Sequence, residues 1–335
     1  MQKLRKRLLK SSKNNLPNEE RRPMQLTKTM RELLDAVEQE INRIQGYTKV
    51  PVFYEPIKYF ISLKGKRVRP LLTMLSAKAI DAEDTSSVFP AAAVELLHNF
   101  TLVHDDIMDN DDTRRGKPTV HKRWDISTAI LAGDGLMGFA FDKLLHTPQG
   151  DVAAMARRFA QTMIVICEGQ GLDKMFEAGH KVTLPDYMDM IKRKTSVLLE
   201  LACELGGMTA GADENQLHHL RNFGYELGMG FQIQDDLLDI MADQDQFGKA
   251  VGSDLSRHKQ TILTLLLQEQ GVDIPDVTDV GQFRQLIDQY AVVNRVQDIY
   301  LKHFYHALSH MQNLPDNEAT RQLNELAVAI RDRQW

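Results

Sequence analysis

Residues 89–109, FPAAAVELLHNFTLVHDDIMD, join a long helix-forming pattern to an acidic end. Pro90 stands where proline is favoured at helix starts, and apolar residues then recur at spacings of three and four, the period of an α-helix. The stretch closes with three aspartates, Asp105, Asp106 and Asp109. It therefore predicts a long, mostly apolar helix that carries carboxylates in its C-terminal half.

The same period recurs along most of the chain. It predicts further helices within residues 30–44, 151–177, 184–208, 214–243 and 294–311. Alternating strand patterns are scarce, and none leads into a glycine-rich turn. The chief irregular segments are 81–87, 111–120 and 242–260, with a weaker break near 272–280. We therefore predict an all-α protein in which residues 26–335 form one large helical bundle around a central cavity.

Composition argues against several classes of protein. The chain has 335 residues, of which 43% are hydrophobic, and a net charge of −5, so it can build a sizeable core and lacks the basic character of nucleic-acid binders. No apolar run reaches about 18 residues, the length that a membrane span requires. The two cysteines match no disulfide framework or zinc spacing, which favours a reducing, cytoplasmic location. Residues 1–25 are expected to form a basic, flexible tail, with a transit segment or a membrane-surface anchor as alternatives.

Two aspartate clusters, DDIMD at 105–109 and DDLLD at 235–239, share one spacing. On an ideal helix Asp105 and Asp109 lie about 40° apart and share a face, and Asp235 and Asp239 repeat that arrangement. Carboxylates near a helix C-terminus oppose the helix dipole, and a hard divalent cation relieves this repulsion. Carboxylate oxygens suit Mg²⁺, which also binds substrate phosphates. Because the second cluster lies in the apolar stretch GFQIQDDLLDIM, we expect its aspartates to face a cavity.

A solvated acidic helix end is the alternative for either cluster taken alone. Other metal chemistries fit less well. His104 and Asp105 form an HD pair, as in metal-dependent phosphohydrolases, but His98 and His121 complete no convincing ligand set. A di-iron bundle would need Glu-x-x-His pairs, and the sequence has none in a suitable place.

Basic residues flank both clusters. Arg114 and Arg115 directly follow the first cluster, so their guanidinium groups could reach phosphates that metal ions hold. Others occur in GKRVRP, in KRKTSVLL and after the second cluster, namely Lys66, Arg67, Arg69, Lys194, Lys249 and Lys259. Any one of them alone could be a solvated surface group. Together they exceed what one diphosphate needs, which indicates two phosphate-bearing substrates.

These motifs resemble those of the trans-isoprenyl diphosphate synthases, the polyprenyl synthetase family of geranylgeranyl and farnesyl diphosphate synthases. The resemblance runs from about Gly65 to Thr261 and rests on GKRVRP, LLHNFTLVHDDIMD, RRGKPT, GQGLD, KTSVLL, GFQIQDDLLD and GKAVGSD. It implies the class I isoprenoid synthase fold and a prenyltransferase that works as a homodimer. It also implies a Mg²⁺-dependent, head-to-tail (1′-4) condensation of isopentenyl diphosphate with an allylic diphosphate.

The resemblance also implies a role for each matching residue. Three Mg²⁺ ions would be held by Asp105, Asp109 and Asp235, with support from Asp106, Asp239, Gln170 and Asp173. The allylic diphosphate would be surrounded by Arg114, Lys194, Thr195, Gln232, Lys249 and Lys259. Isopentenyl diphosphate would be bound without metal by Lys66, Arg69, His98 and Arg115. On the helical wheel His98 falls within about 20° of Asp105, although a lone histidine on an apolar helix is more often a core residue.

The growing product is expected to run down the apolar interior below Asp105. Thr101, Leu97 and Val94 lie within about 80° of Asp105 on an ideal wheel and are candidates for the tunnel wall. The family places size-determining residues four and five positions before the first aspartate, here Thr101 and Phe100. A bulky Phe100 is typical of shorter products, so we expect C20, with C15 next. Packing of Phe100 against another helix or a partner subunit is the alternative.

Three other functions stay open at this point. A longer-chain polyprenyl diphosphate synthase would share all these motifs. A non-catalytic partner subunit would be expected to lose motif residues such as Asp105 and Lys194, which this chain retains. A class I terpene cyclase would carry a different second metal motif.

Overall fold

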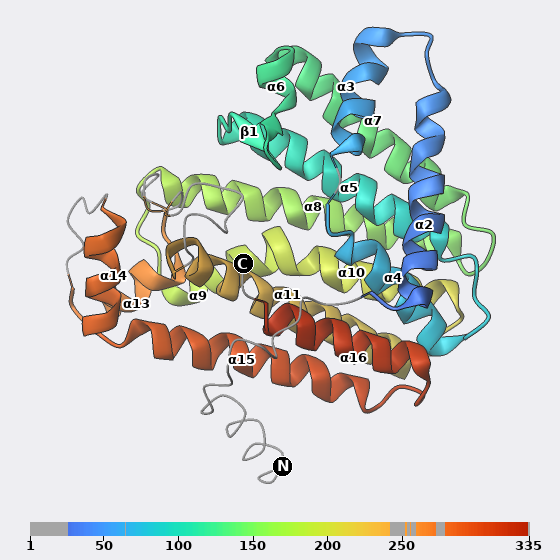
Figure 1. Cartoon of the computed structure of the whole chain (residues 1–335). Helices are drawn as coiled ribbons and strands as arrows, with labels where there is room; N and C mark the ends of the chain where they lie inside the picture. Colours follow the sequence, from blue (N-terminus) through green and yellow to red (C-terminus); the bar gives the residue numbers. More distant parts are fainter. Residues whose placement is uncertain are drawn as a thin grey trace.

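The computed structural model describes residues 26–63, 65–241, 252, 255, 259–272 and 279–333. These residues form a helical protein with one short hairpin (Figure 1). The first elements are α2 (Lys28–Asn42), η2 (Arg43–Gly46), α3 (Pro51–Ser62), α4 (Val68–Ile80), α5 (Val88–Met108), β1 (Thr113–Arg114), β2 (Lys117–Pro118), α6 (Val120–Arg123) and α7 (Ile126–Leu145). The later ones are α8 (Val152–Glu177), α9 (Leu184–Ile191), η3 (Lys192–Ser196), α10 (Val197–Thr209), α11 (Glu214–Met241), α13 (Ile262–Glu269), α14 (Val280–Gln289), α15 (Val292–Met311) and α16 (Glu318–Arg331). The predicted all-α architecture is confirmed.

Side-chain caps define several helix starts. Thr27, Asp125, Asp151 and Asn317 each accept a hydrogen bond from a backbone N–H in the first turn of the helix that follows. The stretch expected to be one helix at 184–208 is instead interrupted by η3, a π-helical turn between α9 and α10. Such turns often occur at functional sites, and η3 contains two predicted site residues, Lys194 and Thr195.

The helices pack around two hydrophobic clusters. In Figure 1, α8, α10 and α11 run side by side through the middle of the molecule, and α10 packs against both α4 and α11. One cluster is centred on α4, α5, α7 and α10, and the other on α9, α11 and α13–α15. Tyr300 packs against both clusters. We therefore propose that residues 26–335 form one domain. Among the described residues, no helix is both long and apolar enough to cross a membrane.

The hairpin after α5 occupies part of the irregular segment predicted at 111–120. Its strands pair Thr113 with Pro118 and Arg114 with Lys117. The two turn residues, Arg115 and Gly116, have φ angles of 53° and 73°, as a tight two-residue turn requires. Left-handed backbone is costly for a non-glycine residue and gathers at functional sites. The hairpin thus presents Arg115 in a fixed, strained conformation beside the acidic end of α5.

Candidate active site

The first aspartate cluster lies at the C-terminal end of α5, among charges from other helices. Burial raises the pKa of Asp105, an effect that Lys194 and Arg114 oppose and that the carboxylates of Asp109 and Asp173 increase. Three carboxylates from two helices therefore lie within electrostatic reach of one another. Accumulated negative charge of this kind favours binding of a cation.

Asp106 points away from that group and is 1% exposed. The Nε and terminal nitrogens of Arg114 lie 2.7 Å and 2.6 Å from one oxygen of this carboxylate. This charge-assisted contact ties β1 to the end of α5. The structure therefore places Asp106 and Arg114, a predicted metal ligand and a predicted diphosphate ligand, in contact with each other.

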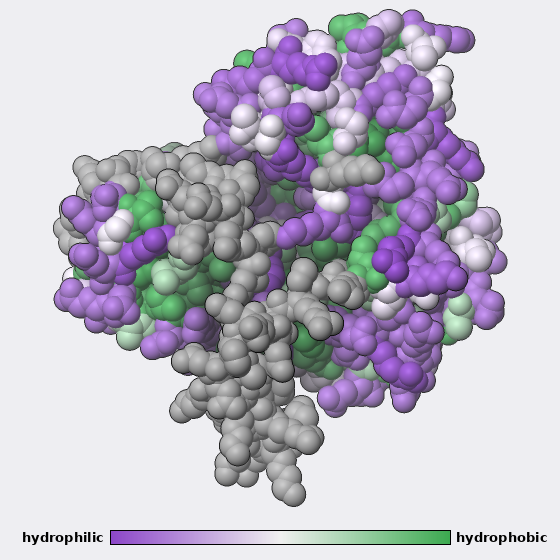
Figure 2. Space-filling model, viewed as in Figure 1, coloured by the Kyte–Doolittle hydropathy of each residue, from purple (hydrophilic) through white to green (hydrophobic). Residues whose placement is uncertain are grey.

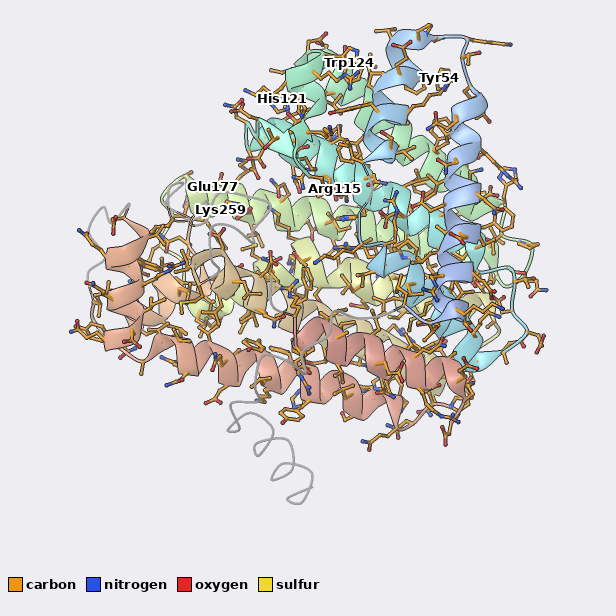
Figure 3. All side chains as sticks on the ribbon, in the orientation of Figure 1. Tyr54, Arg115, His121, Trp124, Glu177 and Lys259 are labelled. Atoms are coloured by element: carbon orange, nitrogen blue, oxygen red, sulfur yellow. The ribbon has the colours of Figure 1, made fainter. Side chains whose placement is uncertain are left out.

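One turn of α8 supplies the wall opposite the first cluster. Asp173 accepts a hydrogen bond of 2.5 Å from Lys194 Nζ and lies 3.8 Å from Lys259 Nζ. Burial alone would raise the pKa of Asp173, but these lysines outweigh burial and hold it below its ordinary value. Lys174 Nζ, which the sequence analysis did not single out, lies 3.5 Å from an Asp109 oxygen. Figure 3 shows Glu177 and Lys259 side by side at this end of α8.

Two glycines bring η3 close to its neighbours. A Cβ atom on Gly169 of α8 would lie 2.4 Å from the backbone nitrogen of Lys194, and one on Gly228 of α11 would lie 2.6 Å from the Cα atom of Ser196. Only glycine allows this approach without displacement of backbone. The π-helical turn is therefore held between α8 and α11, which places Lys194 beside Asp173 and Thr195 beside Gln232.

The second aspartate cluster lies on α11 and has its own polar network. Thr195 Oγ1 donates a 3.0 Å hydrogen bond to Gln232 Oε1, and Gln232 Nε2 donates one of 2.8 Å to Asp236. Asp236 also accepts a 2.6 Å hydrogen bond from the Tyr187 hydroxyl. Asp239, 6% exposed, lines a small pocket together with Lys259.

Asp235 lies near two cations that are distant from it in sequence, Arg333 and Lys66. Its Oδ1 atom lies 3.1 Å from a terminal nitrogen of Arg333. Lys66 lies within electrostatic reach of both residues. Burial lowers the pKa of Lys66, the positive charge of Arg333 lowers it further, and the carboxylate of Asp235 opposes the shift. The predicted site residues Lys66 and Asp235, far apart in sequence, are thus close in the structure.

Arg69, His98 and Arg115 form a basic group. Burial lowers the pKa of Arg69 to about 10, with Arg115 adding to the shift and Glu95 opposing it. Burial, reinforced by the surrounding arginines, holds the pKa of His98 well below its ordinary value, which favours the neutral imidazole. Arg115 donates to the carbonyl of Leu63.

Two features hold this basic group in place. A Cβ atom on Gly65 would lie 2.5 Å from an Arg115 guanidinium nitrogen, so the glycine of GKRVRP makes room for that side chain. Arg67 of the same motif instead pairs with Glu38 and Glu95 at 2.5 Å and 2.6 Å, and its side chain is 5% exposed. Arg67 therefore anchors the loop before α4 and does not face the site.

The predicted chain-length residues lie along α5 below the acidic end. Val94 and Leu97 are fully buried, and Phe100 is 9% exposed. The Phe100 ring packs edge-on against His104 at 4.7 Å between ring centroids. Thr101 Oγ1 donates to the carbonyl of His98 at 2.8 Å. These residues surround an apolar part of the core, and their role in product length stays a prediction.

The residues of this region fit Mg²⁺. The side chains gathered there are oxygen donors, which Mg²⁺ prefers. Gln170 is 9% exposed, and its Oε1 atom is buried without a hydrogen-bond partner in the described part of the chain. Within that part, no three acidic, histidine or cysteine side chains form a preassembled ligand group. Lysine or arginine nitrogens lie beside Asp109, Asp173 and Asp235. Lys249, also predicted in the site, lies outside the described residues.

Figure 2 shows a recess near the centre of this face of the molecule, with hydrophilic and hydrophobic surface in it. A helical bundle with two aspartate clusters linked by Lys194, Thr195 and Gln232, and a basic group nearby, defines a class I isoprenoid synthase.

Comparisons with known proteins narrow this class to a family. The polyprenyl synthetase family model matches residues 50–279. Geranylfarnesyl diphosphate synthase of Natronomonas pharaonis is 35% identical over 307 residues, 84% of this chain and 90% of that protein. Geranylgeranyl diphosphate synthase of Methanosarcina mazei is 41% identical over 249 residues, 73% of this chain and 76% of that protein. The structure of geranylgeranyl pyrophosphate synthetase from Pyrococcus horikoshii superposes with a TM-score of 0.86 at 33% identity, over 91% of this chain and 98% of that one. The chain belongs to the polyprenyl synthetase family.

Proposed function

We propose that this prenyltransferase condenses isopentenyl diphosphate with an allylic diphosphate, head to tail, to give a short trans-prenyl diphosphate and free diphosphate. The observation that carries the proposal is that the η3 turn reaches both aspartate clusters. Lys194 lies within electrostatic reach of Asp105 and donates to Asp173, and the adjacent Thr195 donates to Gln232, which donates to Asp236. Relatives named for geranylfarnesyl and geranylgeranyl diphosphate support a short product.

The roles that the family resemblance implies for diphosphate and metal binding are kept here as proposals, and the contacts above support them. Three Mg²⁺ ions, held by Asp105, Asp109 and Asp235 with Gln170 and Asp173 alongside, would supply the positive charge that stabilises a leaving diphosphate. Lys194, Lys259 and Arg114, which now bind carboxylates, would turn to the oxygens of the allylic diphosphate. Lys66, Arg69, His98 and Arg115 would hold isopentenyl diphosphate. His98 contributes a neutral N–H donor there, whereas the two arginines contribute charge.

The cation formed when the allylic diphosphate departs needs a dry site with suitable acceptors. Thr195 Oγ1 donates its hydrogen bond to Gln232 Oε1, so the lone pairs of the hydroxyl oxygen are available to face that cation. Attack by the double bond of isopentenyl diphosphate is assisted when the two substrates are held side by side. The departing diphosphate would accept the proton that is then lost.

We propose C20 as the main product, with C15 next and longer chains as the alternative, on the basis of Phe100. Phe100 belongs to the first hydrophobic cluster, and its ring lies edge-on against His104. Replacement by a smaller residue, Phe100→Ala, should lengthen the product, whereas no change in length would place the stop elsewhere.

A product assay tests the proposal. Purified protein is incubated with Mg²⁺, labelled isopentenyl diphosphate and dimethylallyl, geranyl or farnesyl diphosphate in turn, and the dephosphorylated alcohols are sized. We expect a series that ends at one length and is abolished by Asp105→Ala or by removal of Mg²⁺. If the folded protein incorporates no label into any chain, the proposed activity is wrong and the result indicates a non-catalytic partner subunit.

We further propose a homodimer in the cytoplasm. Large apolar side chains are exposed on α7 and α8, with Ile130 44%, Leu131 48% and Ile164 57% exposed. Burial of such a surface in a second copy would stabilise the protein. Light scattering should give twice the mass of one chain, and Leu131→Asp should reduce the measured mass to that of one chain.

Two unpaired cysteines, Cys167 and Cys203, support a reducing compartment.

A further inference from the structure

Tyr59, on α3, binds the hairpin that carries Arg115. Its hydroxyl donates a 2.7 Å hydrogen bond to the carbonyl of Pro118, which pairs with Thr113 across the hairpin. In a hairpin with a two-residue turn, the pair next to the turn exchanges hydrogen bonds, and the backbone groups of the following pair point away from the partner strand. The outward carbonyl of Pro118 is thus the group that α3 binds.

The Tyr59 ring is held in turn by the end of α6. The guanidinium carbon of Arg123 lies 4.2 Å from the centre of the Tyr59 ring and 4.7 Å from that of Trp124. The Trp124 ring meets the Tyr59 ring edge-on, with 5.4 Å between the ring centroids. Aromatic and cation–π pairs attract at these distances. The helices α3 and α6 and the hairpin therefore pack as one unit at one end of the molecule (Figure 1).

Arg115 contacts the same helix through its side chain. Its guanidinium donates to the carbonyl of Leu63, the residue at which α3 ends. An arginine has five N–H donors, so Arg115 can bind this carbonyl and a diphosphate oxygen together. Arg114, the preceding residue, binds the carboxylate of Asp106 on α5 instead. The two arginines of the hairpin are thus held by two different helices.

The backbone at Arg115 depends on such support. Its φ angle of 53° is left-handed, and a non-glycine residue keeps that conformation only where its surroundings determine it. The pairing of β1 with β2 determines it in part, and the anchor at Pro118 fixes the hairpin against α3. Release of that anchor would let the turn relax and would move the Arg115 guanidinium away from the end of α3.

We propose that Tyr59 is a positioning residue for Arg115 and, through it, for isopentenyl diphosphate. This role rests on the proposed function, which assigns Arg115 to that substrate. The sequence analysis gave Tyr59 no role, because it lies before the motifs. Since Arg114 is held by α5, loss of the Tyr59 hydroxyl should weaken binding of isopentenyl diphosphate and spare the allylic diphosphate. In the opposing reading, the Tyr59 ring only packs against α6 and its hydroxyl has no part in substrate binding.

Tyr59→Phe removes the hydroxyl and keeps the ring in place. We expect KM for isopentenyl diphosphate to rise about three- to tenfold, the loss expected for one hydrogen bond, while kcat and KM for the allylic diphosphate change by less than about twofold. Calorimetry with isopentenyl diphosphate in the absence of Mg²⁺ should show the same loss of affinity.

Tyr54→Phe is the matched control. Tyr54 lies on the same helix, stacks on Tyr47, and has no hydrogen bond from its hydroxyl to any residue that the structure describes. This variant should therefore keep the affinity and the kinetic constants of the parent.

A double variant separates positioning from packing. With Arg115→Gln in place, the hydroxyl has no guanidinium to position, so Tyr59→Phe/Arg115→Gln should bind isopentenyl diphosphate no more weakly than Arg115→Gln alone. Equal losses in both backgrounds, a parallel rise in KM for both substrates, or an unchanged KM in Tyr59→Phe would each overturn the proposal. A parent that binds isopentenyl diphosphate but incorporates no label would contradict the proposed function, while the measured affinities would still decide the role of Tyr59. A parent that does not bind it would contradict both.

Discussion

The two aspartate clusters share a spacing but hold their middle residue in different ways. Asp106, 1% exposed, is bound by the guanidinium of Arg114. Asp236, 6% exposed, is bound by two neutral donors, the Tyr187 hydroxyl and the Gln232 amide. The contacts of Asp106 thus include an ion pair with a guanidinium, and those of Asp236 include hydrogen bonds from a hydroxyl and an amide.

The aspartate motif alone therefore does not determine which groups surround it. At the first cluster, the support comes from a hairpin that follows within a few residues. At the second, Tyr187 and Gln232 act on Asp236, and a cation from the far end of the chain, Arg333, covers Asp235. The support of the middle aspartate is thus local in sequence at the first cluster, whereas the second cluster also binds Tyr187 and Arg333, which are distant in sequence.

The largest effect is expected where the clusters are alike, at the aspartates proposed to hold metal ions. Asp105→Asn and Asp235→Asn should each lower kcat by on the order of 10²–10³-fold, because each removes a carboxylate proposed to hold the Mg²⁺ that would stabilise the leaving diphosphate. Steady-state assays with Mg²⁺ measure this. Asp142→Asn, at an exposed position of α7, is the control and should retain activity. A tenfold loss or less in either variant would show that its cluster is not essential.

Loss of the charged support should come next. Arg114→Gln leaves Asp106 buried beside a neutral group, and breaking a buried ion pair costs about 3 kcal/mol. Urea denaturation should show that loss in the free energy of unfolding. The double variant Asp106→Asn/Arg114→Gln should recover part of it, because it also removes the buried charge that Arg114 balances. If the double variant is no more stable than the single one, the pair does not act as a unit.

Loss of a neutral support should cost less. Tyr187→Phe removes one hydrogen bond to Asp236 and leaves that of Gln232 intact, so we expect a loss of about 1.5 kcal/mol in the same denaturation experiment. A loss as large as that of Arg114→Gln would remove the distinction between the two clusters. Tyr187→Phe should leave the ring packing of the second hydrophobic cluster unchanged.

Much of this arrangement could be predicted from the sequence, because it is local. The stretch at 89–109 predicted α5, which runs from Val88 to Met108, and the helix period placed Asp105 and His98 on one face. The grouping of His98 with Arg69 and Arg115 is reflected in the pKa of the histidine. The family followed from motifs that occur in order along one chain.

What the sequence could not show depends on contacts between distant segments. The π-helical turn at Lys194 depends on the close approach of Gly169 and Gly228, and a helix period does not reveal it. The contact between Asp235 and Arg333 joins residues about one hundred positions apart. Arg67 looked like its neighbours in GKRVRP, yet it binds Glu38 and Glu95, because only the packed structure shows which way each side chain points.

The last effect is a pH dependence that arises from the surroundings of His98. Burial and the arginines around His98 keep its pKa well below the ordinary 6.5, so the folded protein does not take up this proton as the pH falls through 6.5, whereas the unfolded chain does. The free energy of unfolding should therefore decrease as the pH falls, by at most about 1.4 kcal/mol per pH unit for one group. His98→Gln should remove that part of the slope between pH 7.5 and pH 5, and His180→Gln, at an exposed position after α8, should not. Parallel profiles for the wild type and His98→Gln would mean that His98 is not held neutral by its surroundings, and the contrast in charge between the two clusters would then be smaller than the contacts indicate.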